Sequence, residues 1–472
     1  MTLNIPCNAL PQTLRMAFVL AALASGTLAL ASPGDLDPRF GTAGISRLSL
    51  SDASAARITH PAVQPDGKIV LCGTRTANGV TASDFFVARL NANGALDSTF
   101  SFDGKVAIDF DGGAVAQGDI CSALALQPDG KIVVAGTTQN AAFVSAFALA
   151  RLNTDGTLDA TFGAGGKVTI RFDTADQEEL ATAVAVQADG KIVVAGVHNN
   201  ANNDDFAVMR LLANGALDST FGTKGKVSIA FDLGGSNSDF ANAMAIDGDG
   251  NIVVGGYASN AASTLVAAVA RLDPLGKPDA NFNANGRATI AFTPPGGGSV
   301  RTIEATSMVI QHDGRIVLAG VCDASTSMQD NLDFSATRIF PDGSIDASFG
   351  SNGTASVAFD LVRQGSDVVY DVIEQADGKL LLAGAATGAT STSAMARLNA
   401  DGSADETFGV HGKDTYVIGT AVSAFIGVAL QGEQVVALGF EGDSNGSDYV
   451  VARLQHDDEV FFDTFEVAVP QM

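Results

Sequence analysis

The sequence predicts an all-β fold, a seven-bladed β-propeller of four-stranded blades with a repeat of roughly sixty residues. Three sequence markers recur in fixed order, and each occurs seven times. They are a strand such as KIVVAG (191–196), a strand containing Ala-Arg-Leu such as AVARLD (268–273), and a segment such as LDSTF (217–221). A chain that repeats one β-rich unit in this way buries its apolar residues between neighbouring copies.

One unit is expected to hold four short strands. In the quoted unit these are KVTIRF (167–172), ATAVAVQ (181–187), KIVVAG (191–196) and FAVMRLL (206–212), in that order. The runs are rich in β-branched residues and too short for helices. Because none alternates cleanly between apolar and polar residues, both faces of each sheet are predicted to be covered by neighbouring sheets.

A tight turn is expected between the second and third strands. In QPDG (127–130) the proline sets its own φ, the aspartate suits the next position and the glycine accepts a positive φ. This Pro-Asp-Gly turn explains part of the repetition. The seventh unit has the shorter QGEQ (431–434) in its place.

The two ends of the repeat region complement each other. The last unit ends at the strand of Arg453 without an LDxxF segment, whereas LDPRF (36–40) stands alone near the start. We therefore expect the two ends to complete one blade and to close the ring non-covalently. Removal of residues 35–44 is then expected to destabilise the whole fold cooperatively.

QPDGKIVVAG (127–136), with the pattern ARLN-x-x-G-x-LD-x-x-FG-x-x-GKV that starts at Ala150, resembles the delta-60 repeat family. The resemblance extends over about residues 35–454. It implies a bacterial β-propeller of unknown function and brings no active site. Two departures, at residues 431–434 and at Pro278, affect local geometry and not the predicted fold.

The N-terminal region has the features of an export signal. An apolar run rich in small residues (16–31) ends in an A-x-A cleavage site. We expect a signal peptide at 1–31, the propeller at 32–456 and a C-terminal tail at 457–472. The mature protein is then secreted, periplasmic or at the cell surface, and no later segment is apolar enough to insert into a membrane.

The charge balance restricts the partners. The chain has 52 acidic and 27 basic residues, which gives a net charge of −25. Phosphate backbones repel such a surface, so nucleic acid is not an expected partner. The expected partner is therefore a protein or cell-surface ligand of unknown identity.

Three cysteines follow the signal sequence: Cys72, Cys121 and Cys322. Since an odd number is not a disulfide framework, two interpretations stay open. One is a single bridge between Cys72 and Cys121, and the other is three small buried apolar side chains. We favour the second.

One arginine and one aspartate recur in every unit. Because positions shared by all repeats normally serve the repeat itself, we predict a structural Arg–carboxylate clasp in each blade, bidentate and partly buried, rather than a catalytic pair. The arginines are Arg89, Arg151, Arg210, Arg271, Arg338, Arg397 and Arg453. The aspartates are Asp37, Asp97, Asp159, Asp218, Asp279, Asp346 and Asp405.

No catalytic, cofactor-binding or metal-ligating residue is predicted. GDSNG (442–446) matches G-x-S-x-G but lacks the following helix that a nucleophile elbow needs. DGDGN (247–251) partly matches a calcium loop, yet it aligns with the Pro-Asp-Gly turns. The histidines stand at unrelated repeat positions without metal-ligand spacing: His60, His198, His312, His411 and His456.

Strand alternation predicts that the Pro-Asp-Gly turns and the LDxxFG segments share one face of the ring. The other two loops of each unit share the opposite face; they vary, and are acidic and rich in Asn, Ser and Gly. They include 111–119, 173–179, 232–239, 293–301 and 321–333. These loops are either a binding face, with calcium as a weak possibility for a cofactor, or unselected surface loops.

Two functions are compatible with these features. We favour an exported non-enzymatic propeller with a binding or scaffold role. The alternative is a propeller hydrolase or lyase that uses acidic loop residues. An enzyme would need one unit with singular charged residues pointing into the central channel, and none stands out in the sequence.

Overall fold

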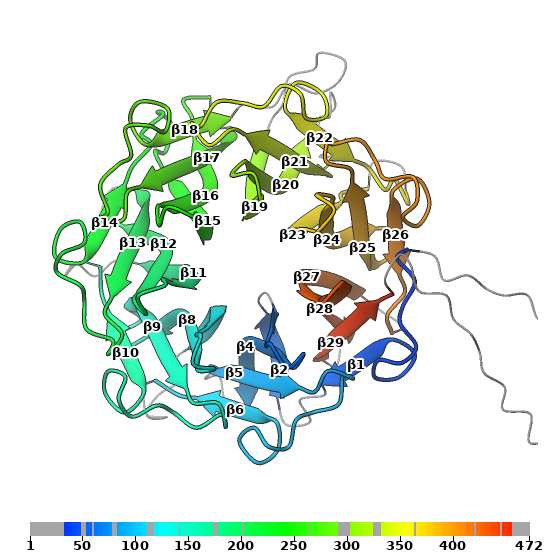
Figure 1. The fold of residues 1–472 in the computed structure, drawn as a ribbon, viewed down its shortest axis with the longest axis horizontal. Coiled ribbons are helices and arrows are strands. Elements are labelled where there is room, and N and C mark those ends of the chain that lie inside the picture. The colour runs from blue at the N-terminus through cyan, green and yellow to red at the C-terminus, as the bar shows by residue number, and fades with distance from the viewer. Residues whose placement is uncertain are drawn as a thin grey trace, which may run out of the picture.

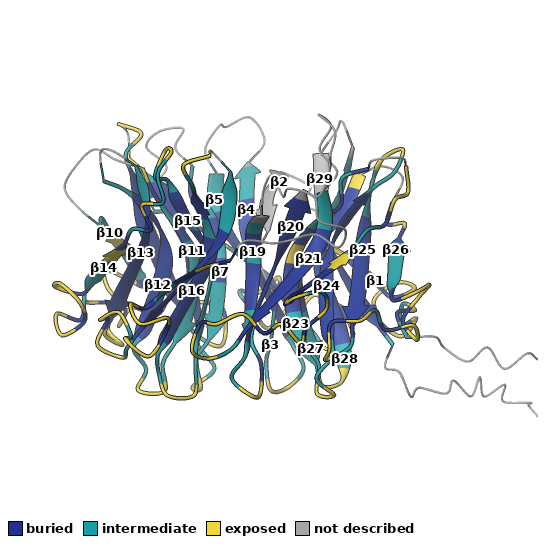
Figure 2. Cartoon of the chain, turned by 90° about the horizontal axis from the view of Figure 1, so that it is seen from above, coloured by how far each residue is buried: buried dark blue, intermediate teal, exposed yellow. Residues whose placement is uncertain are grey.

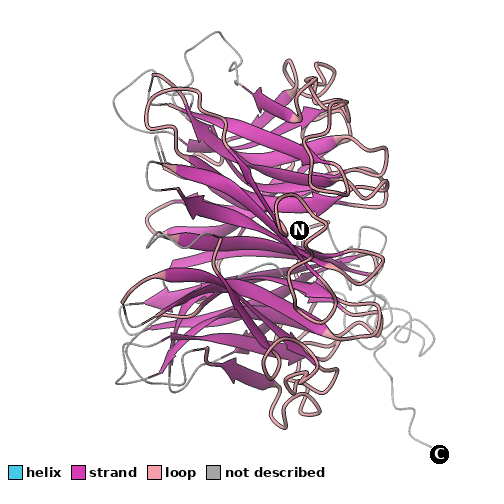
Figure 3. Cartoon of the chain, turned by 90° about the vertical axis from the view of Figure 1, so that its left-hand side faces the viewer, coloured by secondary structure: helices cyan, strands magenta, loops and turns pink. Residues whose placement is uncertain are grey.

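The computed structural model describes residues 33–48, 53–58, 61–77, 83–110, 118–140, 142–172, 178–200, 203–262, 264–290, 303–323, 332–362, 365–419, 422–443 and 446–455. These residues form seven antiparallel sheets around a central axis (Figure 1). Strands and turns make up the described chain, which contains no helix (Figure 3). The predicted seven-bladed, all-β propeller is therefore confirmed. The predicted signal peptide (1–31) and tail (457–472) lie outside the described residues.

The strands of each blade are given from the channel outward. Blade 1 contains β2 (Ala53–Ile58), β4 (Ile69–Ala77), β5 (Ser83–Leu90) and β6 (Lys105–Ile108), with the short β3 (Ala62–Val63) beside β4. Blade 2 contains β7 (Ile120–Leu126), β8 (Ile132–Gln139), β9 (Ser145–Leu152) and β10 (Lys167–Ile170). Blade 3 contains β11 (Glu179–Val186), β12 (Ile192–Asn199), β13 (Asp204–Leu211) and β14 (Lys226–Ile229).

The remaining blades follow the same order. Blade 4 contains β15 (Asp239–Ile246), β16 (Ile252–Ser259), β17 (Leu265–Leu272) and β18 (Arg287–Ile290). Blade 5 contains β19 (Ile303–Ile310), β20 (Ile316–Asp323), β21 (Leu332–Ile339) and β22 (Thr354–Val357). Blade 6 contains β23 (Val368–Glu374), β24 (Leu380–Thr387), β25 (Ser391–Leu398) and β26 (Lys413–Tyr416). Blade 7 contains β27 (Val422–Gln431), β28 (Gln434–Asp443), β29 (Gly446–Leu454) and β1 (Ile45–Leu48).

The predicted assignment of strands to blades is wrong for one strand in each unit. The strand after the LDxxFG segment, β10 in the quoted unit, pairs with β9 of blade 2 and does not belong to blade 3. A bridge between Leu152 and Leu158 holds the start of the LDxxFG segment at the end of β9, so the chain returns beside that strand. The LDxxFG segment is thus a loop within a blade, and the acidic loop after it is the crossover to the next blade.

The core lies between the blades. Each of the seven core clusters combines apolar residues of two neighbouring sheets. All eight residues of β9 are buried, as expected for a strand whose two faces are both covered. Figure 2 shows that much of each strand around the ring is buried. This packing confirms the prediction drawn from the missing apolar–polar alternation.

A β-bulge explains the glycine that ends each KIVVAG strand. In β11 the register to β12 shifts between Ala181 and Ala183. The shift brings the Leu180 carbonyl so close to Gly196 that a Cβ on this glycine would lie 1.9 Å from the oxygen. The inner strands of blades 2 to 7 repeat this bulge.

The two ends of the chain complete blade 7, as predicted. β1 is its outermost strand and pairs with β29, Ser46 opposite Val451. Beyond the strands, the Gln455 N–H donates to the Asp35 carbonyl at 2.9 Å. The ring is therefore closed by hydrogen bonds between residues far apart in sequence.

Cys72 of β4 and Cys121 of β7 form a disulfide between blades 1 and 2. The favoured prediction of three separate apolar cysteines is wrong for this pair. At the next junction, Ala135 and Ala181 hold the corresponding positions and pack in one cluster, so the ring itself brings the two cysteines together. Cys322 is buried in the cluster between blades 4 and 5.

Candidate functional site

The ring has two faces of different construction. The regular face carries the Pro-Asp-Gly turns and the LDxxFG loops. The variable face carries the loops between the second and third strands of each blade, counted from the channel (β8 and β9 in blade 2), and the crossovers between blades. The antiparallel order of the strands confirms this predicted division. In Figure 2 the loops of similar shape along one rim of the ring belong to the regular face.

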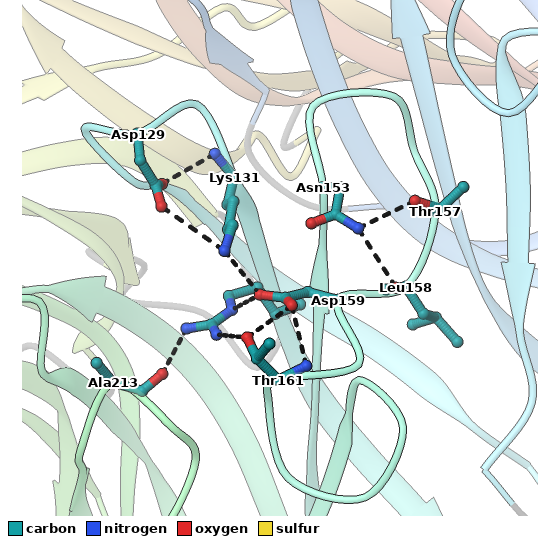
Figure 4. A network of polar contacts seen from close by, with 9 residues as sticks. Asp129, Lys131, Asn153, Thr157, Leu158, Asp159, Thr161 and Ala213 are labelled. Atoms are coloured by element: carbon teal, nitrogen blue, oxygen red, sulfur yellow. Dashed lines mark hydrogen bonds and ion pairs between the residues drawn. The ribbon is translucent and has the colours of Figure 1, made fainter.

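On the regular face, each predicted Arg–Asp pair forms a clasp, and both residues are buried in every pair except that of the half-buried Asp279. In blade 2 the Arg151 Nε donates to Asp159 Oδ2 at 2.7 Å, and Lys131 Nζ reaches the same oxygen at 2.9 Å. The other oxygen, Oδ1, accepts the Thr161 backbone N–H at 3.0 Å and its hydroxyl at 2.7 Å (Figure 4). The bidentate geometry that we predicted is thus absent from this clasp, since Thr161 holds the second carboxylate oxygen.

These contacts determine the charge state of Asp159. Burial by itself raises the pKa of this carboxyl group. The hydrogen bonds from Thr161 and Lys131 outweigh it, together with that from Arg151, and they hold the pKa well below its usual range. A carboxylate kept ionised and fully hydrogen-bonded suits a structural role rather than proton transfer.

The clasp also joins neighbouring blades. Arg151 Nη1 donates to the Ala213 carbonyl of blade 3 at 2.5 Å, and its guanidinium lies 4.7 Å from the centre of the Phe162 ring. Phe162 in turn packs under Gly215 of blade 3, whose φ is +88° and where a Cβ would meet the ring at 3.1 Å. The same junction between blades is therefore stabilised by the arginine, the phenylalanine and the glycine of the repeat.

The clasp recurs around the ring. The Nε–Oδ2 distances range from 2.6 to 3.0 Å in the seven pairs, and each guanidinium lies over the phenylalanine of its own LDxxF segment or, in blade 7, of LDPRF. The pair that closes the ring is Arg453 with Asp37, from the two ends of the chain. The structural interpretation of the repeated Arg and Asp residues fits all seven.

The variable face has its own inter-blade contact, which the sequence analysis missed. An acidic residue just before or at the start of an inner strand accepts the N–H of the phenylalanine that follows the outermost strand of the preceding blade. Four junctions have this contact, at 2.6 to 2.8 Å: Phe110 to Asp119, Phe172 to Glu179, Phe231 to Asp239 and Phe359 to Asp367. The signal was available, because each acid follows the Phe by seven to nine residues.

Acidic side chains gather at one of these junctions. One carboxylate oxygen each of Asp84, Asp109 and Asp119 lies within 4.8 Å of the others, between blades 1 and 2. Asp119 is 2% exposed and Phe110 donates to its Oδ2. The spacing is compatible with a metal ion, although acidic groups also meet for structural reasons.

Near the channel, polar residues at the bulges tie the inner strands together. Thr182 Oγ1 donates to the Ala241 carbonyl of blade 4 at 2.9 Å, and Asn242 Nδ2 donates to the Ala305 carbonyl of blade 5 at 2.8 Å. Thr306 makes the same contact to blade 6. These side chains are therefore engaged in holding the ring.

Blade 4 has a stacked aromatic pair on its two innermost strands, at Phe240 and Tyr257. Phe240 and Tyr257 are opposite each other on β15 and β16, and their rings stack with centres 5.2 Å apart. Burial raises the pKa of the Tyr257 hydroxyl, and the charges of Glu304 and Asp204 add to the rise. Burial also raises the pKa of Glu304, on the innermost strand of blade 5.

The two segments that match functional motifs, 442–446 and 247–251, are parts of hairpins. Gly442 and Gly446 belong to β28 and β29, and Asp443 is paired with Gly446, so residues 442–446 connect two strands; Ser444 lies outside the described residues. Asp247 accepts the backbone N–H groups of Asp249 and Asn251 within its own turn. The interpretation of 247–251 as a turn is confirmed, and the described ends of 442–446 belong to two paired strands.

The histidines are separate in the described structure. His198 Nε2 lies 2.9 Å from Ser228 Oγ, and His411 pairs with Glu406 at an exposed site. The backbone of His312 donates to Glu374. His60 and His456 lie outside the described residues.

The fold and its repeated clasp define a β-propeller repeat protein. A family model described as "Domain of unknown function (DUF5122) beta-propeller" matches the chain six times, at residues 64–100, 127–162, 187–221, 248–282, 311–349 and 375–408. Each match runs from the Pro-Asp-Gly turn to the phenylalanine of LDxxF. Each match thus covers the two middle strands of a blade with the loop between them, and it leaves out the outermost strand and the acidic crossover.

Solved structures share the architecture at low sequence identity. Polysaccharide lyase Uly1 is 10% identical with a TM-score of 0.51, over 90% of this chain and 100% of that one. A protein of unknown function from Dyadobacter fermentans is 13% identical with a TM-score of 0.41, over 91% and 98% of the two chains. Drosophila Semaphorin 1a, extracellular domains 1–2, is 9% identical with a TM-score of 0.45, over 87% of both. Such likeness concerns the fold alone, and no curated protein sequence matches this chain.

Among the described residues, no helix is long and apolar enough to cross a membrane.

Proposed function

We propose that this chain is an exported, non-enzymatic β-propeller that binds a partner through its variable face. One observation carries the proposal. The clasps and the Phe–Gly contacts that join neighbouring blades lie on the regular face, and the family matches end before the acidic crossover loops. The variable loops are left to differ from blade to blade, which is the usual arrangement of a binding surface on a rigid scaffold.

The disulfide supports the proposed export. Cys72 and Cys121 are both fully buried where they join blades 1 and 2. Structural disulfides are typical of secreted and periplasmic proteins and rare in the cytosol. The A-x-A site before Ser32 agrees with this location. We also propose that the repeats are of the delta-60 type, which the spacing of their markers supports.

The test uses the mature protein as bait against envelope and secreted fractions of the source organism. The first variant replaces residues 232–238 of the variable face with a Gly/Ser loop of equal length. Its matched control carries Thr154→Ala and Thr157→Ala on the regular face, where both side chains are exposed. We expect the loop variant alone to lose a captured partner. Equal capture by both variants would refute the variable-face proposal.

A lyase or hydrolase remains the second candidate because of Tyr257 and Glu304. A half-buried phenol and a half-buried carboxyl group with raised pKa values near the channel are groups that can exchange protons with a substrate. Incubation with uronate-containing polysaccharides, monitored through the ultraviolet absorbance of unsaturated products, tests this candidate. Product formation that Glu304→Gln abolishes would replace the binding proposal with an enzymatic one.

A further inference from the structure

Exposed aliphatic side chains gather on the variable face at blade 6. Leu361 and Val362 lie on the crossover from blade 5, whereas Val417 follows β26 and Val422 begins β27. Val417 is 85% exposed, and the other three are 40 to 46% exposed. Elsewhere on the described part of the variable face, only Phe143 of blade 2 is a large apolar side chain exposed to this degree. We call the four aliphatic residues the blade 6 patch.

One hairpin lies between the two halves of the blade 6 patch. This hairpin, residues 388–390, joins β24 and β25. A Cβ on Gly388 would lie 3.7 Å from the Leu361 Cβ, so the crossover from blade 5 packs against one side of the hairpin. On the other side, the Ser393 N–H donates to Ser423 Oγ at 3.1 Å, which holds the start of β27 against β25. The hairpin sequence Gly-Ala-Thr is uncharged, so the patch extends over blade 6 without an intervening charge.

Acidic residues border the blade 6 patch on both sides. Asp360 is exposed and directly precedes Leu361. On the side of blade 7, a Cβ on Gly419 would collide with Glu441 Oε2, so this carboxylate lies against the crossover that follows Val417. Asp448 is the cross-strand neighbour of Glu441. The border of the patch is therefore negatively charged.

The basic side chains described on this side of blades 6 and 7 are already engaged. Arg47 pairs with Glu441 at 2.6 Å, and Lys413 donates to the Ala358 carbonyl. Arg363 lies outside the described residues. Because the whole chain also has a net charge of −25, this region attracts a positively charged partner and repels an acidic one.

We propose that the blade 6 patch binds a segment of a partner protein in which apolar side chains are flanked by lysine or arginine. Apolar patches with a polar border are typical of protein interaction sites. The aliphatic side chains would leave water on binding, and the acidic border would select the charge of the partner. The inference rests on the proposed function, because it assigns a place on the variable face and a chemistry to the bound partner.

Fluorescence anisotropy of a labelled synthetic peptide that alternates leucine and lysine tests the site. The mature protein is titrated in about 150 mM NaCl to screen non-specific attraction to the acidic surface. The patch variant carries Leu361→Ser and Val417→Ser. We expect it to bind this peptide at least about tenfold more weakly, because two aliphatic contacts are lost. A peptide that alternates leucine and glutamate should not bind.

The matched control carries Phe102→Ser and Val410→Ser, which replace exposed apolar side chains on the regular face. The control should bind the leucine–lysine peptide as tightly as the unaltered protein does. Because all four replaced side chains are exposed, both variants should keep the Tm of the unaltered protein. Equal affinity of the patch variant and the unaltered protein, or equal affinity for the two peptides, would overturn the proposed site.

Sedimentation velocity without peptide tests a second copy of this chain as the alternative occupant. The net charge of −25 opposes self-association, so we expect a monomer. Self-association that the patch variant abolishes would assign the patch to a second copy and overturn the basic partner. The capture experiment is independent of these peptides: loss of capture in the 232–238 variant together with equal peptide affinity here would refute the patch and leave the proposed function standing.

Discussion

At the residue scale, the clasp shows how a buried charge becomes structural. Arg210 is 3% exposed and donates to Asp218, to the Pro274 carbonyl of blade 4 and to Thr220. Arg210→Ala should lower the free energy of unfolding by about 3–5 kcal/mol, because Asp218 would remain buried and lose its main cation. Urea unfolding measures the change.

An exposed pair provides the control for this prediction. Arg47 donates to Glu441 at 2.6 Å, but its side chain is 43% exposed. Arg47→Ala should therefore change the free energy of unfolding by at most about 1 kcal/mol. Similar losses in the two variants would contradict the idea that burial and the contact to the next blade give the clasp its strength.

The clasp aspartates also predict acid sensitivity. Burial opposes ionisation of Asp218, yet the hydrogen bonds from Thr220 and the charges of Arg210 and Lys191 lower its pKa from 3.8 to about 2. The pKa values of Asp37 and Asp405 are also lowered to about 2. A depressed pKa contributes stability that is complete above the unfolded value and is lost as the pH falls through the folded one.

Stability should therefore decline between about pH 4 and pH 2, with proton uptake on unfolding. Thermal unfolding across this range measures the decline. Asp218→Asn should be less stable at pH 7 and should lose less stability on acidification, because one titrating group is gone. An identical pH dependence in both proteins would exclude the clasp as its source.

At the element scale, the bulged inner strand depends on a glycine in its neighbour. Gly196→Ala would place a Cβ 1.9 Å from the Leu180 carbonyl and 2.9 Å from the Ala181 Cα. Both contacts are to backbone, so β11 must move away from β12, at a cost of about 1–3 kcal/mol or more. Chemical denaturation measures this loss.

Gly248→Ala is the matched control for the bulge. Nothing lies within 4 Å of its added Cβ, and its φ is not positive. This substitution should change stability by no more than about 0.5 kcal/mol. If Gly196→Ala were equally neutral, close approach of the two strands would not explain the glycine of KIVVAG.

The same elements show what the sequence could and could not predict. The Pro-Asp-Gly turns and buried strands were predictable because their signals are local. The blade to which β10 belongs was not, since its sequence fits the edge of either neighbouring sheet and its pairing depends on how the LDxxFG segment folds back along β9. The Cys72–Cys121 disulfide depends on which positions face each other across a junction, which the closed ring determines.

The acidic contacts between blades were only partly predictable from the sequence. At four junctions the acid beside the inner strand is visible in the sequence, but its partner is a backbone N–H of the preceding blade, which no side-chain pattern reveals. The burial of Asp239 likewise depends on the packing of two blades against each other. Such sites emerge only when the crossovers are placed in space.

At the scale of the whole molecule, blade 7 contains the two ends of the chain. The Gln455 N–H donates to the Asp35 carbonyl. This hydrogen bond is equivalent to the one from the Asn399 N–H to the Ser403 carbonyl in blade 6. Gly34 has a φ of +102° and lies against the Phe408 ring, and it is equivalent to Gly402 in the repeat. The loop of blade 7 is thus interrupted at a single point, after Gln455.

This correspondence predicts that a circular permutant of the chain folds stably. Two residues separate Asn399 from Gly402, so two residues joining Gln455 to Gly34 should restore a continuous loop. A chain that runs from residue 51 to 455, through this link and on to 34–48, should fold to the same ring with a Tm at least equal to that of the mature protein. Deletion of 35–44 should instead lower Tm in one cooperative transition, because it removes Asp37 from the Arg453 clasp and the Asp35 carbonyl that accepts the Gln455 N–H. Calorimetry of both variants compares them directly. A destabilised permutant would contradict the proposed match between the two loops, and a deletion with unchanged Tm would show that residues 35–44 do not contribute to closing the ring.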